Sequence, residues 1–121
     1  MKRFVSGVLT GWFVLGVALL GQQLASEKVV QPQVLVDNQK VKVVRWTMQP
    51  GEGSPIHAHL LDHIYVVIHG SKIREITKDG KVHDDDQETG RADFSPAKGK
   101  VHSFANIGQT PYEMVSIELK Q

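Results

Sequence analysis

The sequence contains no cysteine, no excess of charge of one sign, and no repeat or linker-like segment. Without cysteine the chain has no disulfide, no thiolate-bound zinc or iron–sulfur cluster, and no cysteine nucleophile. With 14 Lys+Arg against 13 Asp+Glu, the net charge of +1 gives no electrostatic basis for binding nucleic acid, and no nucleic acid partner is expected. A length of 121 residues without a Pro-rich tract or a Gly/Ser linker predicts one globular domain. Histidine is the residue in excess, with six copies in the chain.

The N-terminal segment has the pattern of an export signal. Lys2 and Arg3 precede an uncharged, mostly apolar stretch that runs from Phe4 to Gly21. A basic start followed by an apolar run is typical of a secretory signal peptide, although this run is also long enough to remain as a membrane anchor. The sequence therefore predicts a signal peptide or signal anchor over residues 1–26 and a domain over residues 27–121. The domain is expected to be periplasmic or secreted, or else anchored to the inner membrane through residues 4–21.

The rest of the chain is predicted to consist of short β-strands. Alternating β-branched and aromatic residues, with turns rich in Gly and Pro, favour an antiparallel sandwich or barrel. Ile64–Ile68 is apolar at every position, so this strand is expected to be buried on both faces. Asp84–Gly90 is expected to be an acidic, solvated loop. Strand segments are predicted at 34–36 and 41–48, and strands at 56–60, 63–69, 72–78, 81–83, 92–95, 101–106 and 112–119.

Four of the histidines are candidates for a metal site. His57 and His59 lie two residues apart on a predicted strand, so their side chains point to the same face. His63 follows four residues later, and His102 comes from a distant strand. Imidazole binds iron, nickel, copper, zinc and manganese, so three or four converging histidines would form a divalent metal site. On spacing alone, an exposed and unused His-x-His pair is an equally good interpretation.

The glycines around these histidines resemble two sequence motifs of one family. Gly51, five residues, His57-Ala58-His59, three residues, His63, six residues and Gly70 resemble the first motif of the cupin superfamily. Gly90, five residues, Pro96-Ala97-Lys98-Gly99, two residues, His102, three residues and Asn106 resemble the second motif, with one extra residue between Pro96 and Gly99. The resemblance implies a small all-β jelly-roll barrel with a metal held by His57, His59, His102 and one further ligand. It also implies a homodimer, because single-domain cupins commonly pair through an outer sheet.

The sequence departs from the family pattern at the fourth ligand. His63 stands where the first cupin motif has glutamate, and Asp62 precedes it. We expect His63 to be the ligand, because strand alternation points Asp62 away from the face of His59 unless a bulge intervenes. A set of imidazoles favours iron, nickel, copper or zinc over manganese, which a carboxylate would hold more firmly. Fe(II) is the expected metal, with Ni, Zn, Cu or Mn as alternatives. A cupin that has lost its metal is the remaining interpretation.

The function that this resemblance implies is oxidative or binding chemistry on a small molecule. Sites of three or four histidines resemble those of thiol and diketone dioxygenase cupins, which act on small chelating organic substrates. The sequence shows no clear general acid or base facing inward, since Tyr65, Trp46 and Met48 are best explained as barrel core. The mouth is therefore expected to be apolar. The alternative is a non-catalytic periplasmic cupin that binds or senses a metal or small molecule. His69 and His83 are expected at the surface, and Asn106 is expected to hydrogen-bond the turn at Gly108.

Overall fold

The computed structural model describes residues 24–120, and these residues form β-strands joined by turns and loops. Of the predicted signal peptide or signal anchor at residues 1–26, residues 1–23 lie outside the described residues, as does Gln121. In the described part of the chain, none of the secondary structure is a helix with the length and hydropathy needed to cross a membrane. The strands are β2 (Lys28–Val29), β3 (Gln33–Asp37), β4 (Val41–Met48), β5 (Glu52–Gly53), β6 (His57–His59), β7 (His63–His69), β8 (Ser71–Thr77), β9 (Val82–Gln87), β10 (Ala92–Ser95), β11 (Lys100–Asn106) and β12 (Tyr112–Leu119).

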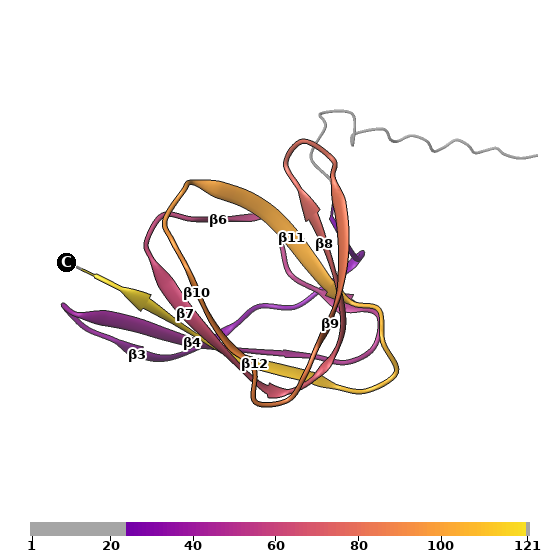
Figure 1. Cartoon of the computed structure of the whole chain (residues 1–121), viewed down its shortest axis with the longest axis horizontal. Helices are drawn as coiled ribbons and strands as arrows, with labels where there is room; N and C mark the ends of the chain where they lie inside the picture. The colour runs from indigo at the N-terminus through magenta and orange to yellow at the C-terminus, as the bar shows by residue number, and fades with distance from the viewer. Residues whose placement is uncertain (1–23, 121) are drawn as a thin grey trace, which may run out of the picture.

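The strands form two sheets that face each other (Figure 1). One sheet has the order β10-β7-β12-β4-β3, and its ladders are antiparallel. The other has the order β2-β5-β11-β8-β9, with β6 also paired to β11. Neighbouring strands in both sheets come from distant parts of the sequence, such as β11 beside β6 and β8. This topology brings His102 of the second motif next to His57 and His59 of the first.

The hydrophobic core lies between the sheets and follows the alternation of the strands. On β4 the buried residues are Val44, Trp46 and Met48, which share one face because side chains alternate along a strand. The facing sheet contributes Ile73 and Phe104. The whole buried cluster consists of Val44, Trp46, Met48, Val67, Ile73, Phe104 and Tyr112. The prediction that 64–68 is buried on both faces is wrong at its end, where Ile68 is 45% exposed.

The expected closed barrel is not formed, and the fold is a two-sheet jelly roll. Among the described residues, no ladder joins the edge strand β9 of one sheet to the edge strand β10 of the other. The Arg91 side chain connects these edges instead, since its Nη1 lies 2.9 Å from Asp85 Oδ2 and its Nε lies 2.8 Å from Asp93 Oδ2. Charged side chains therefore take the place of backbone pairing where a barrel would close.

The acidic run was predicted as a loop, but Asp84, Asp85 and Asp86 belong to strand β9. The reason is the basic composition of the neighbouring strand, β8. Arg74 pairs directly opposite Asp84 and donates two hydrogen bonds to its carboxylate, at 2.8 and 2.9 Å. Lys72 lies opposite Asp86, with the two charged groups 3.9 Å apart. Cross-strand pairs of opposite charge stabilise an exposed strand that its own sequence would not favour.

Candidate metal centre

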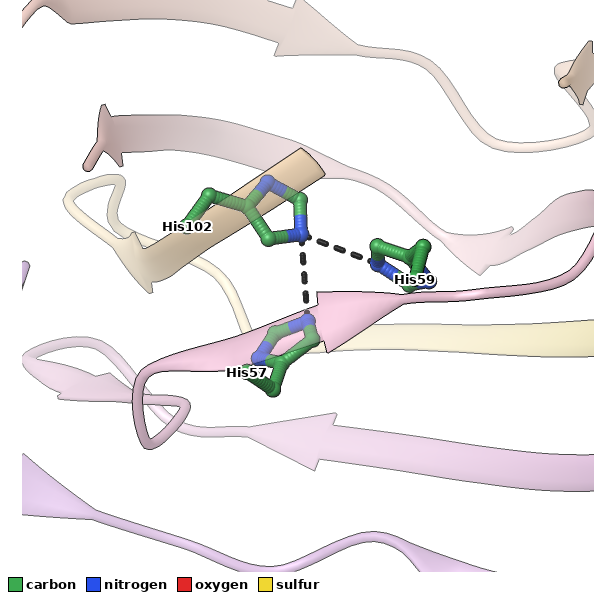
Figure 2. Close-up of side chains that lie close together, drawn as sticks. All are labelled: His57, His59 and His102. Atoms are coloured by element: carbon green, nitrogen blue, oxygen red, sulfur yellow. Dashed lines mark hydrogen bonds between the residues drawn. The ribbon is translucent and has the colours of Figure 1, made fainter. Parts of the chain in front are cut away.

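Three of the predicted ligands come together on adjacent strands of one sheet (Figure 2). In the ladder between β6 and β11, His57 lies directly opposite His102, and His59 lies opposite Lys100. Residues that are opposite each other or two apart share a face of the sheet, so all three imidazoles project to the same side. The β6–β11 register is thus the structural reason that residues more than forty positions apart in the sequence form one group.

The three imidazoles converge through their Nε2 atoms. His102 Nε2 lies 2.9 Å from His59 Nε2 and 3.1 Å from His57 Nε2. The ring planes meet at 65° to 81°, so the three nitrogens approach from different directions. Nitrogens about 2.1 Å from one ion and at right angles to each other are about 3.0 Å apart. The separations of His102 Nε2 from the other two nitrogens therefore fit adjacent ligand positions on one octahedral ion.

In His57 and His102, the hydrogen bond made by Nδ1 determines which ring nitrogen carries the proton. His57 Nδ1 donates to the Pro55 carbonyl at 2.9 Å, and His102 Nδ1 donates to the Glu75 carboxylate. When both rings are neutral, these hydrogen bonds leave each Nε2 atom with a lone pair rather than a proton. Two lone pairs only 3.1 Å apart repel each other unless a cation lies between them. The Nε2 atoms, together with the hydrogen bonds that Nδ1 of His57 and His102 makes, therefore fit a bound metal ion.

Glu75 is the part of this site that the sequence did not reveal. Its carboxylate accepts hydrogen bonds from His102 Nδ1 and from Lys100 Nζ, the latter at 2.8 Å. The hydrogen bond from His102, reinforced by Lys100, lowers the pKa of Glu75 to about 2 despite its partial burial. Metal-bound histidines commonly donate their second N–H to a carboxylate. The pairing register of β8 and β11 places Glu75 at this site. Thr77 lies opposite His102, and Glu75 is two residues from Thr77, so its side chain is on the same face as His102.

The surroundings keep the imidazoles of His57 and His59 neutral. Burial lowers the pKa of His59 to about 3, and the neighbouring His63 and His102 add to this effect. Burial also lowers the pKa of His57, against a smaller opposing contribution from the Pro55 carbonyl. Trp46 packs against the His57 ring with centroids 5.8 Å apart. Neutral imidazole is the form that binds metal, so these groups are ready to do so at neutral pH.

His63 lies beside this group but does not belong to it. Its ring stacks on that of His59, with centroids 4.3 Å apart and planes at 18°. It comes from β7 of the facing sheet, whereas His57, His59 and His102 come from β6 and β11. Asp62, the alternative fourth ligand, instead accepts a hydrogen bond from the Ala97 N–H at 2.6 Å. The fourth ligand therefore stays a prediction, and the geometry groups three histidines.

A cavity of about 500 Å³ lies between the sheets and includes His59, His63 and His102 in its wall. The prediction of an apolar mouth is wrong, because Tyr65, Arg91 and Asp93 also line the cavity. Tyr65 donates a hydrogen bond to Asp93 at 3.0 Å, and Arg91 pairs with the same carboxylate. Burial and the bond to Asp93 raise the pKa of Tyr65, so its hydroxyl stays protonated. The cavity lining thus combines these polar groups with the apolar side chains of Trp46, Ile73, Phe94, Phe104 and Met114.

The residues predicted to lie outside the site do so in the structure. His69 is exposed, with Nδ1 2.6 Å from the Pro111 carbonyl. His83 is also exposed, at the edge of the cavity. Asn106 is fully buried, and its Oδ1 accepts the Gly108 N–H at 2.9 Å, as expected.

Comparison with known proteins supports the same fold. No protein-family model and no curated protein matches the chain. Among solved structures, a cupin domain from Bordetella pertussis Tohama I is 27% identical, with a TM-score of 0.70 over 84% of this chain and 100% of that one. A double-stranded β-helix protein from Klebsiella pneumoniae is 20% identical, with a TM-score of 0.62 over 89% and 90% of the two chains. A predicted oxalate decarboxylase from Thermotoga maritima is 20% identical, with a TM-score of 0.55 over 73% and 77%.

These findings define the class of the protein. The two facing sheets and the solved neighbours together show that the chain has the cupin fold. Within that class, it carries a group of three histidines, His57, His59 and His102, that is suited to holding a metal ion.

Proposed function

We propose that this chain is a metal-dependent cupin that binds a small chelating organic molecule in its cavity. His57, His59 and His102 hold one divalent transition metal, and the observation that supports this is the convergence of their Nε2 atoms at 2.9 and 3.1 Å. Fe(II) is the preferred ion, with Ni, Zn, Cu or Mn as alternatives, because an all-imidazole set suits the softer divalent metals. When bound, such an ion supplies Lewis-acid and redox chemistry to its ligands.

A dioxygenase-like oxidoreductase activity is the first candidate. Three protein ligands leave up to three positions on an octahedral ion for a chelating substrate and oxygen. The cavity of about 500 Å³ adjoins these histidines and is large enough for a small organic molecule. Its apolar wall, formed in part by Trp46 and Phe104, would exclude water from the bound molecule.

A non-catalytic binding or sensing role is the second candidate, and one observation favours it. The carboxylate, guanidinium and tyrosine groups named below are paired with other side chains rather than free to move a proton. Tyr65 and Arg91 both bind Asp93, and Glu75 is occupied by His102 and Lys100. An enzyme that used one of these groups as a general acid or base would require its pair to open.

Metal analysis tests the proposal directly. Protein purified without added metal is expected to contain about one equivalent of a transition metal, and His57→Ala and His102→Ala are expected to contain almost none. His69→Ala is the matched control, because His69 is an exposed histidine outside the group. Equal metal content in all four proteins, or none in any, would overturn the metal-binding proposal.

Oxygen consumption then separates the two candidate functions. Fe(II)-loaded protein is assayed with pentane-2,4-dione as a chelating diketone and with oxalate, which the name of the Thermotoga neighbour suggests as a second small chelator. Consumption of oxygen that depends on substrate and is abolished in His102→Ala supports the enzyme. Tight binding of these compounds without turnover supports the binding role.

Export and dimerisation remain part of the proposal. The sequence pattern at residues 1–26 supports export, and fractionation of cells expressing the full chain tests it. Strand β3 supports a homodimer, because it is an edge strand whose Val34, Leu35 and Val36 are 54%, 41% and 43% exposed. Light scattering should give twice the chain mass, and Val34→Lys/Val36→Lys should give a monomer; a monomeric native protein would refute the dimer.

A further inference from the structure

Lys100 lies next to the candidate metal centre. In the ladder between β6 and β11 it is directly opposite His59, and it comes two residues before His102. Side chains directly opposite each other in an antiparallel pair have Cβ atoms about 5 Å apart, and residues two apart on a strand share a face. Lys100 therefore projects to the same side as the imidazoles and lines the same cavity. A protonated lysine has no lone pair, so it adds a positive charge beside the three histidines without adding a metal ligand.

The charge of Lys100 is balanced only in part. Its Nζ lies 2.8 Å from Oε2 of Glu75, and the same oxygen also accepts the hydrogen bond from His102 Nδ1. One carboxylate is thus shared between two donors. Within residues 24–120, Lys100 forms an ion pair with no other carboxylate. An ammonium group has three N–H donors, and the Lys100 side chain is 48% exposed, so it can still donate to a bound molecule.

Arg91, which also lines the cavity, is in the opposite situation. Its Nη1 lies 2.9 Å from Asp85 Oδ2, and its Nε lies 2.8 Å from Asp93 Oδ2. Two carboxylates thus pair with one guanidinium, and this part of the cavity wall carries a net negative charge. An anionic group of a bound molecule would be repelled there. Of these two cations, Lys100 is therefore the one that can receive such a group.

We infer that Lys100 is a specificity-determining residue that binds an additional anionic group of an organic molecule whose chelating oxygens bind the metal. This inference rests on the proposed metal-dependent function and names the ligand class for its cavity. The ligands are chelators that carry a carboxylate or a similar anionic group beyond the chelating oxygens. The ammonium group ends a flexible four-carbon side chain, so it can adjust to the position of that anionic group. A neutral chelator with the same skeleton gains nothing from Lys100.

Two diketones that differ in one group provide the test. In 4,6-dioxoheptanoate a carboxylate stands in place of the terminal methyl group of heptane-2,4-dione, beyond the chelating oxygens. Both are titrated into Co(II)-loaded protein, because the visible absorption bands of Co(II) report metal and ligand binding. Wild-type protein is expected to bind 4,6-dioxoheptanoate about tenfold more tightly than heptane-2,4-dione, as for a hydrogen bond between charged groups.

Three variants assign this preference to one side chain. Lys100→Met removes the charge at similar length, so the two diketones are expected to bind with dissociation constants within about twofold of each other. Lys100→Arg keeps a positive charge and is expected to retain most of the preference. Lys72→Met is the matched control, because Lys72 is a half-exposed lysine of the same sheet that pairs with Asp86 away from this cavity. Its preference should equal that of wild type.

Equal affinity of wild-type protein for the two diketones, or a preference that survives in Lys100→Met, would overturn the inference and leave the metal site intact. Loss of Co(II) from Lys100→Met as complete as from His57→Ala would also overturn it, since Lys100 would then act on the metal centre itself. Absence of Co(II) binding by wild-type protein would instead refute the proposed function, and the inference with it. Should Lys100→Met fail to fold, the same pair of titrations on Lys100→Gln provides the test.

Discussion

The carboxylate of Glu75 accepts a hydrogen bond from Nδ1 of His102 and so fixes which nitrogen of that ring carries the proton. Glu75 is on β8 and His102 is on β11, and the pairing of these strands holds the two side chains on one face. The arrangement leaves His102 Nε2 with its lone pair directed toward His57 and His59. Glu75 thus acts on the candidate metal centre through His102 rather than by contact with the ion.

Glu75→Gln is expected to weaken metal binding without removing it. The amide can still accept the proton of His102 Nδ1, but it no longer supplies the negative charge that makes the imidazole a stronger ligand. Metal affinity, measured by competition with a chromophoric chelator, is expected to fall about tenfold. Glu113→Gln is the control, since Glu113 and its ion-pair partner Arg45 both lie on the sheet that does not contain Glu75. Unchanged affinity in Glu75→Gln would show that the contact is purely structural.

Metal addition is expected to stabilise the folded protein. Because the unfolded chain lacks the preformed group of three histidines, a metal present at 100 times its dissociation constant adds about 2.7 kcal/mol. For a domain of this size, the melting temperature should rise by roughly 10 °C. Differential scanning fluorimetry of chelator-treated protein with and without added metal measures the shift. His102→Ala should show almost no shift, and an equal shift in both proteins would place the metal elsewhere.

The metal-free protein is expected to lose stability as the pH falls below neutral. His57, His59 and His63 all have pKa values lowered from 6.5 by burial, to about 3 for His59. Below pH 6.5 the unfolded chain therefore binds more protons than the folded one, and protonation favours unfolding. The stabilising effect is complete above pH 6.5 and declines as the pH falls toward the folded-state pKa values.

Urea denaturation of chelator-treated protein at about pH 7.5 and about pH 5 measures this effect. The pH 5 sample should unfold at lower urea, and the difference should shrink in the His57→Asn/His59→Asn variant. Glu75 does not account for a change in this interval, because its unfolded-state and folded-state pKa values, 4.5 and about 2, both lie below it. Equal midpoints at the two pH values would contradict the prediction.

The sequence motifs predicted the fold because their glycines have conformations or contacts that other residues tolerate poorly. Gly51, Gly90 and Gly99 have φ values of 91°, 90° and 63°, in the left-handed region that favours glycine. A Cβ on Gly70 would lie 2.2 Å from the Gln87 carbonyl oxygen, which leaves no room for a side chain. These glycines fix the turns between strands. The turns allow the strands to pair so that His57, His59 and His102 come together.

The features that the sequence did not predict depend on pairing between distant strands. Glu75 has no motif spacing, and only the β8–β11 register places it against His102. Asp84 was assigned to a loop because its own segment is acidic, yet Arg74 on the adjacent strand stabilises it in β9. Arg91 was not expected in the cavity wall, and its ion pairs to Asp85 and Asp93 occupy the gap where a barrel would close. Charge complementarity across strands cannot be read before the register is known.

Asn106 is expected to be among the most sensitive positions for stability. Its side chain is fully buried and makes four hydrogen bonds: Nδ2 donates to the Met48 and Thr110 carbonyls at 3.0 and 2.8 Å, and Oδ1 accepts from Gly108 N–H and Ser71 Oγ at 2.9 and 2.7 Å. Asn106→Ala removes all four and leaves buried partners unsatisfied, at a cost of about 3 kcal/mol.

The matched control for this substitution is Asn38→Ala. Asn38 Oδ1 accepts two backbone N–H groups, from Lys40 and Val41 at 2.8 and 2.9 Å, but in an exposed turn where water can replace it. Its loss should therefore cost about 1 kcal/mol or less. Urea denaturation of both variants measures the difference. Asn106 joins the end of β11 to the end of β4 and to the following turn. If the two variants lost similar amounts of stability, burial would not increase the contribution of these hydrogen bonds.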